Sequence, residues 1–185
     1  DASDTINWNS YAGFEPIGND TNPFTGTFDG KNNTITGLHI DRPNTDYIGL
    51  FGYTDNSEIR NIGLEDINVT GNNRIGGLVG HTDGSVSQSY AAGSVTGYNY
   101  VGGLVGQTDS SVSQSYAVVN VTGNWQIGGL VGHTGSSVSQ SYAVVNVTGN
   151  SEVGGLVGHT RGIVECSYAT GNVTGDNEVG GLEGF

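Results

Sequence analysis

The sequence has little of what defines several common protein classes. A single cysteine excludes an intrachain disulfide framework. Only 34% of the 185 residues are hydrophobic, which leaves little material for an ordinary globular core. No apolar run approaches the roughly 18 residues of a membrane-spanning helix, so membrane insertion is not expected. Stability must come from backbone pairing around a thin core.

Cations are scarce as well. Five Lys and Arg stand against 18 Asp and Glu, and the formal net charge is −13. Nucleic acid binding needs clustered cations, so we expect no nucleic acid partner, and anionic membranes are disfavoured for the same reason. Charged residues make up only 12% of the chain, which is therefore no polyacidic tail. The polar opening Asp1-Ala2-Ser3-Asp4 is expected of a mature form or an excised piece.

What the sequence does contain is glycine, organised in a repeat. The hexapeptide Ile75-Gly76-Gly77-Leu78-Val79-Gly80 recurs at 101–106, 127–132 and 153–158, with a partial copy at 179–184. The period is 26 residues without a gap. A Ser-Val-Ser-Gln-Ser-Tyr block and a Val-Thr-Gly block follow in register, at 85–90 and 95–97 in the first unit. Each block is short, rich in β-branched residues and bounded by turn formers, which is the pattern of strands.

The repeat predicts an all-β fold, a parallel β-solenoid or β-helix with three short strands per 26-residue coil. Identical residues then stack in columns, and the backbone groups of each coil pair with the coils above and below. Parallel crossovers favour a right-handed solenoid. The expected inward columns are Leu78, Leu104, Leu130 and Leu156; Val86, Val112, Val138 and Val164; and Val95, Val121, Val147 and Val173.

The repeat also divides the chain, within one structural domain overall. Residues 71–185 hold the regular coils, and residues 1–70 are expected to form atypical starting coils or a cap. Large side chains there could plug one end of the stack: Trp8, Tyr11, Phe14, Phe24, Phe28 and Phe51. The C-terminal edge is expected to continue in a longer array or to be open for end-to-end association. About six or seven coils are expected in all.

The units resemble the GLUG repeat of bacterial and archaeal surface proteins, through Gly77-Leu78-Val79-Gly80 and its copies. The segments 24–30, 34–38 and 49–52 resemble the region that leads into such repeats. Such repeats occur in adhesin-like proteins and in stalks beside secreted peptidases. The resemblance implies a secreted or cell-surface protein with a display or spacer role and no catalytic residues.

The corner between the Val-Thr-Gly block and the next Gly-Gly block is where the copies differ most, from Asn72-Asn73-Arg74 to Asn124-Trp125-Gln126. Stacking of the coils would bring Tyr98, Tyr100 and Trp125 together on neighbouring coils. An aromatic cluster flanked by amides is a plausible ligand-binding platform for a sugar ring or a partner protein. The alternative is a permissive turn with incidental aromatic residues.

Metal and cofactor sites are not expected. His81, Gln107, His133 and His159 share a column, with His133 and His159 about 4.8 Å apart, but that column has no carboxylate, so a polar surface ladder is favoured. Asp83 and Asp109 stack similarly, yet Gly135 and Arg161 follow them. A Ca²⁺ site there would lack the oxygen ligands that it needs unless backbone carbonyls help.

Threonine and asparagine form further columns. Thr96, Thr122 and their equivalents raise ice binding as a hypothesis, although a hydroxyl ladder also simply suits a β-sheet. Six sequons offer possible glycosylation at Asn19, Asn32, Asn68, Asn120, Asn146 and Asn172. Glycans on successive coils would crowd one another, so full occupancy is not expected.

Catalysis is not expected. The five cations are scattered and no acidic pair recurs within the regular coils, as a polysaccharide-cleaving β-helix would require. We therefore predict a non-catalytic adhesin-type module for cell adhesion or structural spacing, meeting a host, matrix or sister surface molecule, with a glycan as one candidate contact. The alternatives are a self-assembling fibre or surface-layer subunit, an ice-binding protein and a carbohydrate-active enzyme.

Overall fold

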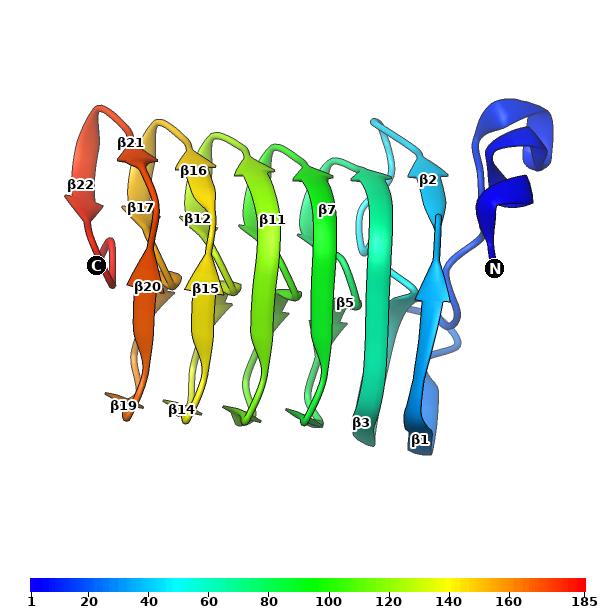
Figure 1. The fold of residues 1–185 in the computed structure, drawn as a ribbon, viewed down its shortest axis with the longest axis horizontal. Coiled ribbons are helices and arrows are strands. Elements are labelled where there is room, and N and C mark those ends of the chain that lie inside the picture. Colours follow the sequence, from blue (N-terminus) through cyan, green and yellow to red (C-terminus); the bar gives the residue numbers. More distant parts are fainter.

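The molecule is a stack of parallel β-coils. A computed structural model describes residues 1–185. In Figure 1 the chain climbs the near face along β7 and β11, crosses the top and descends on the far side while it moves from right to left. This is a right-handed parallel β-solenoid, so the predicted fold class and hand are confirmed.

Each regular coil contains four strand positions, at which identical residues pair with a 26-residue offset, as in Val112 with Val86 and Val138. The first position is β4 (Asn73–Gly76), β8 (Asn99–Gly102), β12 (Trp125–Gly128), β17 (Ser151–Gly154) and β22 (Asn177–Gly180). The second is β5 (Val79–Thr82), β9 (Val105–Thr108), β13 (Val131–Thr134) and β18 (Val157–Thr160).

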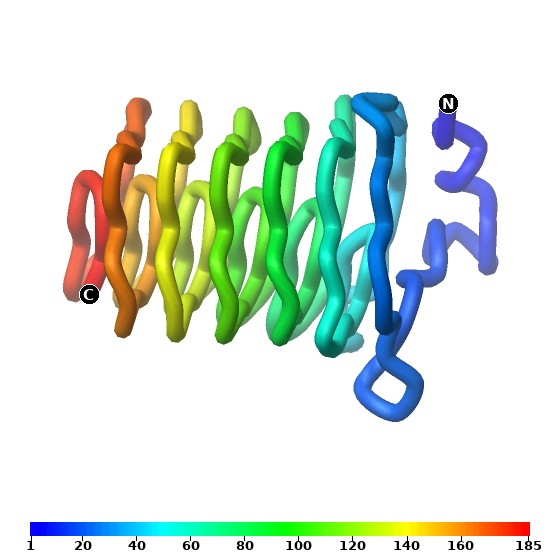
Figure 2. Tube along the Cα trace, turned by 90° about the horizontal axis from the view of Figure 1, so that it is seen from below, coloured from blue at the N-terminus to red at the C-terminus, as the bar shows by residue number.

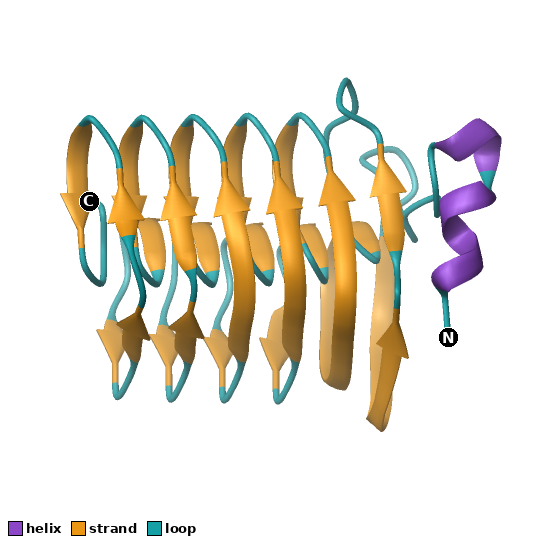
Figure 3. Cartoon of the chain, turned by 45° about the horizontal axis from the view of Figure 1, so that its top comes forward, coloured by secondary structure: helices purple, strands orange, loops and turns teal.

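The other two positions follow in the same order along each coil. The third is β6 (Ser85–Ser87), β10 (Val112–Ser113), β14 (Val138–Ser139) and β19 (Val164–Glu165). The fourth is β7 (Tyr90–Thr96) and β11 (Tyr116–Thr122), then β15 (Tyr142–Val144) with β16 (Asn146–Thr148), and β20 (Tyr168–Thr170) with β21 (Val173–Thr174). Figure 3 shows these strands as successive orange rows along the stack.

The expected three strands per coil are thus corrected to four, because the Gly-Gly block is not one strand. The chain bends between Gly76 and Val79, and the two halves of the block lie face to face. A side chain on Gly102 would overlap the carbonyl of Val105 and lie 2.7 Å from the nitrogen of Gly132. Only glycine lets the two backbones approach so closely.

The core runs the length of the stack. All four leucines of the predicted column are fully buried, as are Val86, Val112 and Val138, so these inward positions are confirmed. Val164 and Val173, in the last coil, are only partly buried. The columns of Ile75 and of Val79 are also buried in each regular coil up to Val153 and Val157, which sequence reasoning did not assign.

The N-terminal segment departs from the repeat. Two short 3₁₀ helices, η1 (Ser3–Asn7) and η2 (Asn9–Tyr11), precede β1 (Phe24–Thr36), β2 (His39–Asp41) and the long β3 (Phe51–Thr70). Figure 2 shows residues before β1 as a separate loop at the N-terminal end of the stack. Phe24 and Phe28 pack on the buried Phe51, whereas Trp8 and Tyr11 are 50% and 71% exposed and plug nothing.

Candidate binding face

One residue at the start of each coil has an unusual backbone conformation. Tyr47, Arg74, Tyr100, Gln126, Glu152 and Glu178 all have φ between 50° and 61°. We call this set the corner column. The left-handed conformation is uncommon for residues with a side chain, and strained residues of this kind cluster at functional sites. A second column with positive φ, Gln88, Gln114, Gln140 and Cys166, is nearly constant in sequence, whereas the corner column changes from coil to coil and is therefore the candidate binding position.

A second column faces the corner column and interlocks with it. We call it the facing column, and it consists of Tyr53, His81, Gln107, His133 and His159. Gln126 Oε1 lies 2.9 Å from His133 Nδ1, and Arg74 Nε donates to Gln107 Oε1 at 2.8 Å. His133 and His159 stack with ring centroids 5.0 Å apart, close to the predicted spacing.

The expectation that the histidines form a surface ladder is wrong. His81, His133 and His159 are only 7%, 7% and 9% exposed, because corner-column side chains lie against them. Burial lowers the pKa of His133 from 6.5 to about 4, with a further contribution from the neighbouring His159. Burial is also the main reason why the pKa of His81 is lowered. Both imidazoles are therefore neutral at pH 7.

Two of the three predicted aromatic residues come together. Tyr100 and Trp125 pack edge to face with ring centroids 5.2 Å apart, and the Arg74 guanidinium lies 5.2 Å from the centroid of the Tyr100 ring. Tyr98 belongs to a neighbouring position of the corner, stacks on neither ring and is 56% exposed. The corner thus combines an anchored aromatic pair with one projecting tyrosine.

Glu152 holds this corner in place. Its carboxylate accepts hydrogen bonds from Trp125 Nε1 and Gln126 Nε2, each at 2.7 Å, and lies 2.8 Å from His159 Nδ1. The side chain is only 12% exposed. Sequence reasoning weighed the aromatic residues of this corner and missed Glu152, although its appearance at the position of Tyr100 and Gln126 was the available signal.

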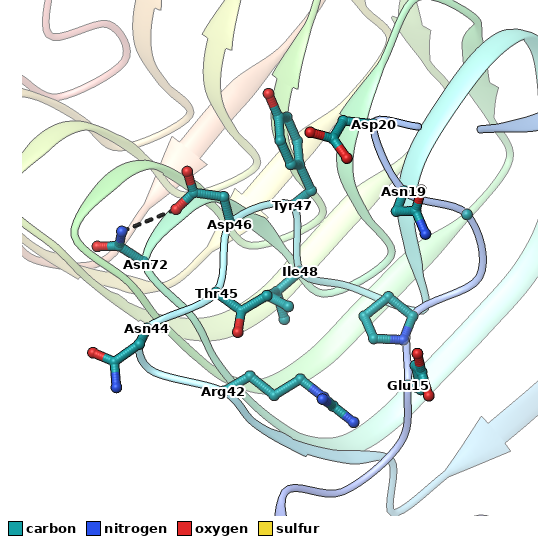
Figure 4. A pocket seen from close by; sticks show the side chains of 12 residues that line it. Glu15, Asn19, Asp20, Arg42, Asn44, Thr45, Asp46, Tyr47, Ile48 and Asn72 are labelled. Atoms are coloured by element: carbon teal, nitrogen blue, oxygen red, sulfur yellow. Dashed lines mark hydrogen bonds between the residues drawn. The ribbon is translucent and has the colours of Figure 1, made fainter. Parts of the chain in front are cut away.

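A polar cavity of about 550 Å³ opens beside the first residue of the corner column. Its walls include Tyr47, three carboxylates (Glu15, Asp20 and Asp46) and a single cation, Arg42. Figure 4 shows Tyr47 and Asp20 on one side of the cavity and Arg42 on the other. Asp46 Oδ1 accepts a 2.9 Å hydrogen bond from Asn72 Nδ2, which fixes the carboxylate at the rim. Sequence reasoning did not predict this cavity, since its walls come from separate coils.

The outward face of the fourth strands carries regular ladders instead of a pocket of this kind. Tyr90, Tyr116, Tyr142 and Tyr168 stack with nearly parallel rings, 4.7, 4.8 and 5.1 Å between successive centroids. The predicted threonine column of Thr96 and Thr122 lies on this face, while a second threonine column ends the second strands. Thr96, Thr122 and Thr148 are exposed, whereas Thr82, Thr108 and Thr134 are fully buried. No two-column threonine array forms.

The sequon asparagines are all exposed. Asn68, Asn120, Asn146 and Asn172 occupy one column of the fourth-strand face, where Asn146 Nδ2 donates to Asn120 Oδ1 at 3.3 Å. Asn19 Oδ1 accepts hydrogen bonds from the backbone of Thr21 and Asn22, and Asn32 lies in β1. The free Cys166 is exposed as well.

The fold and its columns define a class: a repeat protein of the β-solenoid type. Residues 71–96, 97–122 and 123–148 each match the GLUG motif, so the predicted family resemblance is confirmed and the chain carries three consecutive GLUG repeats.

Two curated relatives share this sequence pattern. Over 101 residues the chain is 43% identical to Halomucin of Haloquadratum walsbyi, a match that covers 51% of this chain and 1% of the relative. Over 53 residues it is 45% identical to a putative Gly-rich membrane protein of Evansella cellulosilytica, covering 28% of this chain and 6% of that one. The chain thus corresponds to a small part of each. No solved structure shows significant similarity. None of the helices has the length and apolar character to cross a membrane.

Proposed function

We propose that this chain is a rigid display module of a surface-associated, extracellular repeat protein and that it functions in adhesion, without catalysis. One observation carries the proposal. The second, third and fourth strand positions repeat almost unchanged, while the corner that leads into and begins the first position changes from coil to coil and presents Tyr98, Tyr100 and Trp125. A constant scaffold with one variable edge is the arrangement by which repeat proteins present binding surfaces.

The relatives support a role at the cell boundary. One is named as a mucin and the other as a membrane protein, and in each the matched part is a small fraction of a long chain. A stack in which backbone hydrogen bonds join every coil to the next suits a spacer that holds a surface at a distance. The formal charge of −13 favours hydration of such a surface.

The corner supports a glycan on a host, matrix or sister surface molecule as the partner. Sugar rings pack on aromatic side chains, and their hydroxyls pair with amides and carboxylates. Tyr98 is exposed at the same corner as the anchored pair of Tyr100 and Trp125, and the polar cavity beside Tyr47 adds carboxylates at this edge.

A glycan array with the labelled full chain tests the proposal. We expect a subset of glycans to bind and Tyr98→Ala to weaken that binding at least tenfold. Tyr168→Ala is the matched control, since this tyrosine is similarly exposed, at 53%, but lies on the fourth-strand face. Equal losses in both variants, or no glycan bound by the folded chain, would contradict a corner site.

The remaining alternatives have direct assays on the same sample. Fibres seen by light scattering and microscopy at rising concentration would favour a self-assembling subunit. Thermal hysteresis would favour ice binding, and release of reducing ends from polysaccharides would favour a carbohydrate-active enzyme.

A further inference from the structure

Three side chains that can bind a metal ion, one from the facing column and two beside it, come together from two adjacent coils. His81 and Asp83 belong to one coil and Asp109 to the next. Their ligand atoms all lie within 4.8 Å of one another. The parallel pairing of β5 with β9 brings them together, because Thr82 stands opposite Thr108 and the aspartates follow directly. In sequence, 26 residues separate the two carboxylates.

His81 has no well-formed hydrogen bond of its own. The residue is 7% exposed, and its Nδ1 is buried without a hydrogen-bond partner. Its Nε2 lies 3.3 Å from Asp83 Oδ1 without forming a well-aligned hydrogen bond. The ring is fixed by packing against Tyr53, with centroids 4.6 Å apart. In a neutral imidazole one nitrogen carries a lone pair, and Nε2 is the nitrogen that lies beside the carboxylates and can bind an ion there.

The two carboxylates lack a countercharge. Neither aspartate pairs with a Lys or Arg side chain, and His81, the one basic side chain within ion-pair distance of Asp83, is neutral at pH 7. Asp83 Oδ2 accepts a hydrogen bond from the Tyr53 hydroxyl at 3.3 Å, which orients the group without neutralising it. Arg74, whose charge acts on His81, is engaged with Gln107 and with the Tyr47 and Tyr100 rings. Like charges opposite one another in a sheet are destabilising, so a bound cation would relieve the pair.

We propose that His81, Asp83 and Asp109 form a binding site for one divalent transition-metal ion, of the Zn²⁺ type, that links two coils. One imidazole nitrogen and two carboxylate oxygens are a ligand set suited to Zn²⁺, with water in the fourth position. Ca²⁺ is a poor match because it takes six to eight oxygen ligands. The aspartates reach solvent, so an ion can enter.

The site occurs once along the stack. His133 is followed two residues later by Gly135, and His159 by Arg161. Gly135 has no side chain, and this leaves room for Asp109. A Cβ on Gly135 would lie 2.8 Å from Asp109 Oδ1. The chain therefore supplies its own control in His133, an equally buried histidine whose own coil has glycine, not aspartate, two residues later.

Isothermal titration of the tag-free, metal-stripped full chain with ZnCl₂ and, separately, CaCl₂ tests the proposal. We expect one equivalent of Zn²⁺ to bind more tightly than Ca²⁺. His81→Gln, which copies Gln107, and Asp109→Asn should each weaken Zn²⁺ binding at least tenfold, while His133→Gln leaves it unchanged. Circular dichroism verifies that each variant is folded.

Three results would overturn the assignment. Zn²⁺ binding that survives both His81→Gln and Asp109→Asn would place the ion elsewhere. Loss of binding in His133→Gln would assign it to the stacked His133 and His159 pair. No Zn²⁺ binding by the folded chain, or tighter binding of Ca²⁺, would remove the site as proposed. None of these outcomes depends on the glycan-binding corner.

Discussion

Glu152 is the residue on which the corner depends most. Its carboxylate forms hydrogen bonds with the side chains of Trp125, Gln126 and His159. Glu152→Ala would therefore leave buried donors without an acceptor. We expect a loss of about 2–4 kcal/mol in the free energy of unfolding, measured by urea denaturation. Glu178→Ala is the control, because Glu178 has the same backbone conformation one coil later but is exposed and makes no side-chain hydrogen bond. It should change stability by less than about 0.5 kcal/mol. Similar losses of unfolding free energy in Glu152→Ala and Glu178→Ala would mean that the hydrogen bonds of Glu152 add no stability of their own.

His133 should make the stability of the molecule depend on pH. Its folded-state pKa of about 4 lies below the ordinary value of 6.5, so the unfolded chain binds the proton first as the pH falls. The contribution of His133 is therefore complete above pH 6.5 and is lost progressively toward pH 4.

Urea midpoints of the wild type and of His133→Gln across this range test the expectation. Glutamine already occupies the equivalent position at Gln107 and does not titrate. The difference between the two proteins should change between pH 6.5 and 4 and be flat above it. Parallel curves through the whole range would show that His133 is protonated equally in both states.

At the scale of elements, the bend between the first and second strands depends on glycine. A methyl group on Gly129 would overlap the Gly155 carbonyl oxygen and lie 2.6 Å from Val145 Cγ2. Gly155 belongs to the next coil, so its carbonyl can withdraw only if the two adjacent coils separate. We expect Gly129→Ala to cost about 3 kcal/mol or more, measured by urea denaturation.

Gly181 gives the matched comparison for this bend. It occupies the same column, yet a Cβ there would meet nothing within 4 Å. Gly181→Ala should therefore unfold at nearly the wild-type urea concentration. If both substitutions were tolerated, the close approach of adjacent coils at this bend would not be a requirement of the fold.

At the scale of the whole molecule, the regular coils should be interchangeable. Residues 97–122 form one complete unit, and Thr96 would join Gly123 as it now joins Gly97. Deleting this unit should leave a folded solenoid shorter by about 4.8 Å, measurable by small-angle X-ray scattering. Deleting half of the unit should prevent folding, because the columns would no longer match. A folded half-unit variant would contradict stacking by identical residues.

The periodic features of this molecule could be predicted from the sequence. A gapless repeat with β-branched blocks dictates stacked coils, and the leucine and valine columns follow from the same register. The number of strands per coil could not be predicted, because a Gly-Gly pair in the sequence is compatible both with one continuous strand and with a bend between two strands. Only the packing of Gly102 against Val105 distinguishes these possibilities.

The sequence by itself determined the solenoid, its register and the corner at which the coils differ, since all three depend on residues that recur at one spacing. Tertiary structure decided that the histidines are buried, that Glu152 anchors Trp125, and that His81, Asp83 and Asp109 meet. The physical reason is that the corner and facing columns belong to strands folded against each other. Their contacts therefore depend on the bend between those strands and not on the repeat.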